Sequence, residues 1–113
     1  MGAAMIHGEK AGNSLILVFD VDHLDAGNSA SFRNEAFPLI QTEKNVILDL
    51  AGVTFVDSAG LGALLSMMRN LGERGGDFKV CSVAKPVQVL FELVRLNRIL
   101  PIFATRADAL AAK

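Results

Sequence analysis

The chain contains 113 residues, with 11 Lys and Arg against 12 Asp and Glu, which gives a formal net charge of −1. This length predicts one domain over residues 1–113, and a composition that is 51% hydrophobic and 20% charged excludes a disordered chain. The near-zero charge provides no long-range field that would attract nucleic acid or anionic lipid, so we expect neither as a partner.

Cysteine and histidine are scarce. Cys81 is the only cysteine and His7 and His23 are the only histidines, so the sequence predicts neither an internal disulfide nor a clustered metal site. No apolar run approaches the roughly 20 residues that cross a bilayer. The first ten residues lack the basic region and apolar run of a secretory signal. We therefore expect a cytoplasmic protein without a membrane anchor.

The chain opens with two short apolar-rich runs, at residues 5–9 and 15–19, separated by a turn that contains Gly12 and Asn13. This pattern predicts a β-hairpin. After Asp25, apolar residues recur at helical spacing and predict a helix that carries them on one face: Phe32, Ala36, Leu39 and Ile40. Pro38 lies inside this pattern and should kink the helix or end it early, because proline lacks an N–H and clashes one turn back.

Residues 46–50 are apolar apart from Asp49, which is typical of a strand buried on both faces. The chain then leads through Gly52 into a second apolar run at residues 53–56. A helical stripe follows and predicts an amphipathic helix that the glycines of residues 72–76 would stop: Leu61, Leu64, Leu65, Met68 and Leu71.

Residues 78–83 predict another strand. Pro86 suits a first helical position, Asn97 suits a helix end, and the stripe between them predicts the next helix: Val87, Leu90, Phe91 and Val94. Residues 101–103 predict a short last strand. Thr105 and Asp108 match a capping box that opens a final helix.

Strands and helices alternate after the opening hairpin. This order predicts an α/β fold with a mixed, mostly parallel sheet, an N-terminal antiparallel hairpin and about four helices. Binding sites in such sheets lie beyond the carboxyl ends of the strands. The turn at residues 56–62 and the turn after Phe19 are therefore the candidate positions.

Ser58 lies where the strand pattern stops and the helical period begins. One interpretation is structural: Ser58 caps the helix, and the neighbouring glycines permit tight packing. The other is functional: an uncovered hydroxyl at a helix N-terminus can be phosphorylated, which adds about −1.5 to −2 charges. Asp57 either caps the helix or tunes the charge of the site, and we favour the cap.

The segment NVILDLAGVTFVDSAGLGALL, at residues 45–65, resembles the signature of the anti-sigma factor antagonists, which belong to the STAS-domain superfamily. The resemblance extends to Leu24-Asp25 with Asn28 and Phe32, and to residues 90–110. Three residues depart from the family pattern: Asp22 and Arg95 stand where glycine is common, and Asn28 replaces the usual threonine.

The resemblance implies a single STAS domain that switches partners. In this family the unphosphorylated antagonist binds an anti-sigma factor that is also a serine kinase, which frees the sigma factor. The kinase phosphorylates the serine that corresponds to Ser58, and a serine phosphatase restores it. Nucleotide and magnesium would belong to the kinase, because this chain has no phosphate-binding loop signature, so we expect no cofactor.

The candidate partner-binding residues are Asp22, Asp25, Asp57, Ser58, Ala59, Gly60, Leu61 and Gly62. If the acidic loop at residues 20–25 lies beside Ser58, its carboxylates favour a basic docking surface on the partner. The alternative interpretation is that these aspartates are ordinary solvated turn residues.

The sequence leaves two alternative functions open. Ser58, His23 and an aspartate could form a hydrolase triad, but Val56 stands where a nucleophile elbow requires glycine, so we expect no enzymatic activity. The other is a STAS domain that regulates a non-transcriptional output, such as a stress-signalling, secretion or chemosensory regulator or a transporter-associated subunit. Fold alone cannot separate these outputs, because function depends on the surface carried by the fold.

Overall fold

The N-terminal hairpin forms as the sequence predicts. The computed structural model describes residues 4–112, so residues 1–3, which belong to the N-terminal segment that lacks secretory-signal features, lie outside the described part. Strands β1 (Ile6–Ala11) and β2 (Ser14–Phe19) pair antiparallel, from Ile6 opposite Phe19 to Ala11 opposite Ser14. Gly12 adopts a φ of 59° in the connecting turn, a conformation that glycine reaches without a steric penalty.

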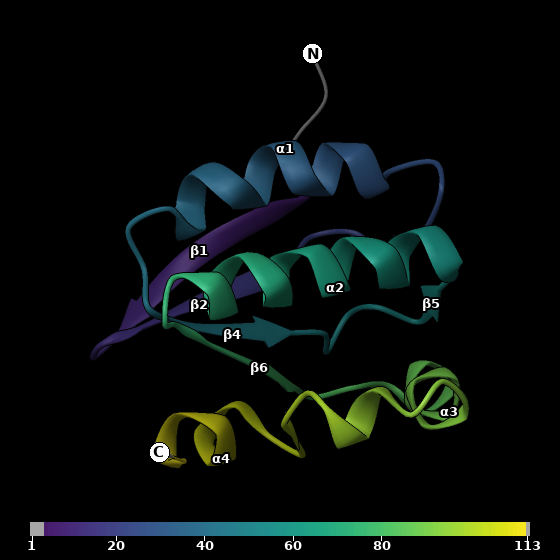
Figure 1. The fold of residues 1–113 in the computed structure, drawn as a ribbon. Helices are drawn as coiled ribbons and strands as arrows, with labels where there is room; N and C mark the ends of the chain where they lie inside the picture. Colours follow the sequence, from purple (N-terminus) through teal and green to yellow (C-terminus); the bar gives the residue numbers. More distant parts are fainter. Residues whose placement is uncertain (1–3, 113) are drawn as a thin grey trace.

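Four of the five strands of the main sheet run parallel. Strands β4 (Asn45–Asp49), β6 (Asp77–Cys81) and β7 (Ile102–Phe103) extend the hairpin in the order β1-β2-β4-β6-β7, and every pair after the hairpin is parallel. The predicted α/β class and mixed sheet are therefore confirmed (Figure 1). The β4 residues Val46, Ile47 and Leu48 are fully buried, as the continuous apolar run predicts.

A second, two-stranded sheet was not predicted. Strand β3 (His23–Leu24) pairs parallel with β5 (Phe55–Val56), outside the main sheet. From the sequence, residues 20–25 are expected to form a loop and residues 53–56 a single apolar run. A two-residue strand is too short to show the alternation of apolar and polar residues that predicts a strand. The pairing of β3 with β5 is therefore seen only in the tertiary structure.

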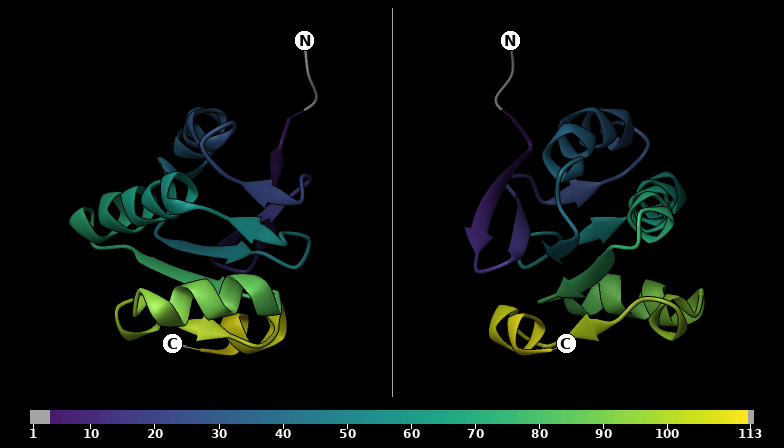
Figure 2. Two further views of the ribbon diagram at one scale, coloured as in Figure 1. Left: turned by 90° about the vertical axis from the view of Figure 1, so that its right-hand side faces the viewer. Right: turned by 60° about the vertical axis from the view of Figure 1, so that its left-hand side comes forward.

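The helices occupy both faces of the main sheet (Figure 2). Helices α1 (Ser29–Ile40) and α2 (Ser58–Glu73) lie side by side on one face over the larger core cluster, which includes Phe32, Leu64 and Leu71. Helix α1 continues two residues beyond Pro38, so of the two outcomes expected there, a kink or an early end, the early end is wrong. Pro38 lies in the last turn, where one lost backbone hydrogen bond faces solvent.

Helix α4 (Arg106–Ala111) covers the opposite face. Its Ala109 packs against the sheet residues Ile16, Ile47 and Cys81. Thr105 caps this helix, since its side chain accepts a hydrogen bond from the Asp108 N–H at 3.1 Å, as predicted.

Helix α3 (Lys85–Leu93) is shorter than predicted. It ends at Leu93, and Asn97 falls in a 3-10 turn, η1 (Leu96–Arg98), instead of closing the helix. Between them Arg95 adopts the left-handed conformation, with φ 60° and ψ 30°. This geometry explains in physical terms why glycine suits this position, because a Cβ is disfavoured there.

Candidate partner-binding site

Asp57 caps the N-terminus of α2. One carboxylate oxygen, Oδ1, accepts a hydrogen bond from the Gly60 N–H at 2.9 Å, and Oδ2 accepts one from the Ala26 N–H at 3.0 Å. These backbone bonds, that from Gly60 above all, lower the pKa of the Asp57 carboxyl. The favoured role of Asp57 as the cap is confirmed, and the interpretation of Ser58 as the cap is wrong.

Ser58 is the first residue of α2 and is exposed to solvent. Because Asp57 makes the N-cap hydrogen bond, the Ser58 hydroxyl does not cap the helix. The structure thus places Ser58 at the exposed start of α2, the position expected from the sequence.

Gly60 is a packing residue. It is buried, and a Cβ at this position would overlap the carbonyl oxygen of Leu24 and lie 2.8 Å from its carbonyl carbon. Gly62, two residues later, has open space where its Cβ would be. Gly60 therefore allows α2 to approach β3 closely, whereas Ala59, Leu61 and Gly62 remain partly accessible.

The two strand-end turns meet. Besides the β3–β5 pairing, the Thr54 N–H donates to the Asp22 carbonyl at 2.8 Å, and the Asp57 N–H donates to the Leu24 carbonyl at 3.3 Å. Together with the bond from the Ala26 N–H to the Asp57 carboxylate, these contacts hold the acidic loop beside the start of α2. The structure thus brings the candidate residues of both turns into one surface.

Two of the three loop aspartates, Asp22 and Asp25, differ in their surroundings. The Asp22 side chain is 79% exposed and forms a 2.9 Å hydrogen bond with His23, which lowers the pKa of Asp22 and raises that of His23. Asp25 is half-buried and accepts the Gly27 N–H at 2.9 Å. Asn28 accepts from the Asp25 N–H and donates to the His23 carbonyl, so it ties the loop together. Asp25 therefore has a turn-forming role, and Asp22 presents its charge to solvent.

A second set of linked polar side chains, which no sequence motif indicates, begins at Asp20 of this loop. The His7 ring bonds Asp20 at 2.7 Å through Nδ1 and Glu9 at 3.0 Å through Nε2, and these contacts raise the pKa of His7. Glu9 also pairs with Arg106, which binds the buried Asp49 carboxylate at 2.9 Å. This set connects β1 with α4, and its members are too far apart in sequence to form a motif.

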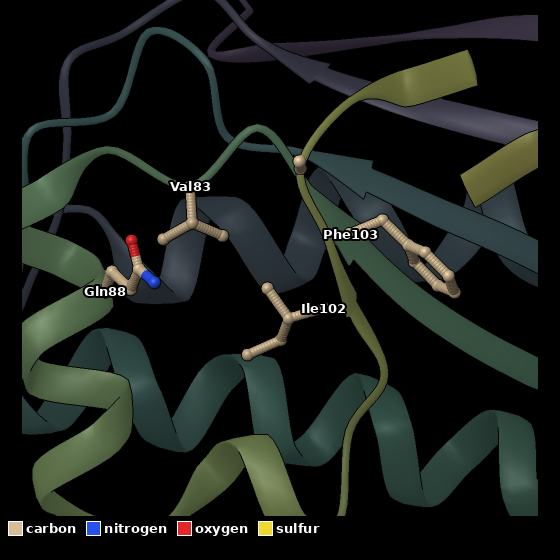
Figure 3. Close-up of a pocket in the computed structure, with 5 residues that line it drawn as sticks. Val83, Gln88, Ile102 and Phe103 are labelled. Carbon is tan, nitrogen blue, oxygen red and sulfur yellow. The ribbon is translucent and has the colours of Figure 1, made fainter. Parts of the chain in front are cut away.

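A shallow pocket of about 310 Å³ lies between α3 and β7. Val83, Gln88 and Ile102 converge on it, while Phe103 points to the other side of β7 (Figure 3). No lining residue of this pocket is titratable, so it offers no acid, base or nucleophile.

The structure gives no support to a hydrolase triad. His23 bonds Asp22, its neighbour in sequence, and within residues 4–112 neither histidine is hydrogen-bonded to Ser58. In the same residues no group of three or more His, Cys, Asp or Glu side chains is arranged to hold a metal ion. None of the helices in the described part is long and apolar enough to span a membrane.

Comparison with known proteins identifies the family. A model of the STAS domain matches residues 8–109. The chain belongs to the STAS domain family. Within it, an anti-sigma F factor antagonist of Paenibacillus polymyxa is 32% identical over 91 residues, which cover 80% of this chain and 77% of that protein. The family that the DSAGLG segment indicated is therefore confirmed.

Solved structures of STAS proteins share the fold. An anti-sigma-factor antagonist (STAS) domain protein of Planctomyces limnophilus has a TM-score of 0.86 at 20% identity, covering 93% of this chain and 94% of that chain. The Bacillus protein SpoIIAA has a TM-score of 0.77 in its unphosphorylated form, at 20% identity over 93% of this chain and 92% of that chain. Its phosphorylated form gives 0.69, at 18% identity over 93% and 96%.

Proposed function

We propose that this STAS protein, a single domain over residues 1–113, is an anti-sigma factor antagonist that works by partner switching. Its unphosphorylated form binds an anti-sigma factor that is also a serine kinase, and so releases the sigma factor. Phosphorylation of Ser58 ends this binding, and a serine phosphatase restores it. The observation that carries the proposal is the exposed Ser58 hydroxyl, which is freed from capping by Asp57 and lies beside the acidic loop.

The proposed interface contains the accessible residues around this turn. Asp22, Asp25 and Asp57 supply negative charge, and Ala59, Leu61 and Gly62 supply partly exposed, uncharged surface beside Ser58. Gly60 is buried beneath this surface and supports it indirectly, because it allows α2 to pack closely against β3. A basic surface on the partner complements these carboxylates and would raise the rate of association.

The arrangement of the cap explains how a phosphate would act as a switch. Helix N-termini commonly stabilise phosphate through free N–H groups. Here the Gly60 and Ala26 N–H groups already donate to the Asp57 carboxylate. A phosphate on Ser58 therefore adds about −1.5 to −2 charges next to an existing carboxylate, with two nearby donors already occupied. The partner must then desolvate this charge, and a loss of about 2.7 kcal/mol weakens binding 100-fold.

The chain acts in this scheme as a binding partner and not as an enzyme. ATP and magnesium belong to the kinase, and the phosphatase carries the reverse reaction. Because the kinase draws on the ATP of the cytoplasm, the proposal places this protein there. Its relatives named as anti-sigma factor antagonists support the general role.

The test is phosphorylation by the cognate kinase with Mg-ATP, followed by mapping of the modified residue by mass spectrometry. We expect one phosphate on Ser58 and none on the Ser58→Ala variant. Ser66→Ala is the matched control, because Ser66 lies on the same helix but donates its hydroxyl to the Gly62 carbonyl at 3.0 Å. A phosphate on Ser66 instead of Ser58, or on neither serine, would contradict the proposal.

A further inference from the structure

Helix α3 carries apolar side chains on two sides. Val87 and Phe91 are buried in the core. On a different side of the helix, Val89 is 49% exposed and Leu93 is 76% exposed. Pro86, also exposed, lies one turn before Val89. In the left view of Figure 2, α3 lies across the front of the molecule with no other element in front of it.

The exposed residues form a regular seam. Pro86, Val89 and Leu93 follow the i, i+3, i+7 spacing, which is the spacing of a and d positions where two helices pack against each other. The inner side of α3 contacts mainly β5 and η1. Within residues 4–112, no other part of the chain covers the outer seam, so another molecule can reach it.

Two exposed charges on one flank of the seam favour a second copy of this chain as the partner. Lys85 and Glu92 are seven residues apart, two helical turns, and therefore occupy the same flank. If two copies of α3 pack antiparallel about a two-fold axis near Val89, Lys85 of each copy faces Glu92 of the other. A parallel two-fold pair would place the two flanks on opposite sides of the contact, so Lys85 and Glu92 of one copy would not face those of the other. The charges thus favour the antiparallel arrangement of two identical helices.

We propose that the outer seam of α3 is a self-association surface that pairs two copies of this chain in an antiparallel, two-fold symmetric dimer. Val89 lies at the axis, Leu93 of each copy packs against Pro86 of the other, and two Lys85–Glu92 pairs flank the contact. One nine-residue helix per copy is small for a stable interface. The dimer is therefore weak and depends on concentration. This proposal does not rest on the phosphorylation of Ser58.

Sedimentation velocity of the full chain from about 10 µM to about 1 mM tests the proposal. We expect the wild type to shift from monomer to dimer over this range. Leu93→Ser should weaken dimerisation at least about tenfold. Leu110→Ser is the matched control, because Leu110 is an exposed leucine of α4 outside the seam, and it should dimerise like the wild type. Far-UV circular dichroism checks that each variant is folded.

A charge exchange tests the orientation. Lys85→Glu alone and Glu92→Lys alone should each weaken the dimer, because each brings like charges together. The double variant carries both changes and should restore the wild-type affinity to within about twofold. A wild type that stays monomeric at the highest concentration overturns the proposal, as does a dimer that Leu93→Ser leaves intact. A double variant no better than the single variants overturns the antiparallel arrangement.

Discussion

Gly60 and Gly62 lie two residues apart in α2 but have different surroundings, which permits a matched test of how the site is built. A Cβ at residue 60 would overlap the Leu24 carbonyl oxygen and lie 3.0 Å from Leu24 Cγ, whereas a Cβ at residue 62 meets nothing within 4 Å. Replacing a helical glycine by alanine normally stabilises by up to about 1 kcal/mol. Forcing extra atoms into a packed contact costs about 1–3 kcal/mol.

We therefore expect Gly62→Ala to raise the free energy of unfolding by about 0.5–1 kcal/mol and Gly60→Ala to lower it by about 1–2 kcal/mol. Urea unfolding measures both. With a slope of about 2 kcal/mol per molar urea, a separation of about 2 kcal/mol places the two midpoints about 1 M apart. Equal stabilisation by both substitutions would refute the close approach of α2 to β3.

Other substitutions test the local geometry. Arg95→Gly should stabilise by about 0.5–1 kcal/mol in urea unfolding by relieving the left-handed backbone, whereas Arg95→Ala should give no gain. Asp57→Ala should lower the thermal midpoint and Ser58→Ala should not, because Asp57 is the cap. Asp20 and Glu9 raise the pKa of His7, so its stabilising contribution is complete below the ordinary pKa of 6.5 and is lost as pH rises through the raised value. His7→Gln should remove this pH dependence.

The sequence predicts the framework of the fold well because long elements have a clear hydrophobic period. The alternation after the hairpin implies parallel strands, and β2, β4 and β6 pair in that way. The hydrophobic periods do not set every boundary: α3 ends before Asn97 because Arg95 takes a left-handed conformation, which these periods do not indicate.

The site is predicted less completely. The sequence motif predicts that the turn at residues 56–62 is important. The motif does not predict which residue caps α2, because aspartate and serine are almost equally good N-cap residues. Only the structure shows that Asp57 makes the capping bond to Gly60 and leaves Ser58 exposed. The two-residue strands β3 and β5, which bring the acidic loop to this turn, are too short to recognise from sequence.

The central claim is that a phosphate on Ser58 separates this protein from its partner. The most direct measurement is titration calorimetry of the cognate anti-sigma kinase with the unphosphorylated protein and with the protein fully phosphorylated on Ser58. We expect the Kd of the phosphorylated form to be at least about 100-fold higher, a difference of about 2.7 kcal/mol. Equal affinity of the two forms would contradict the claim.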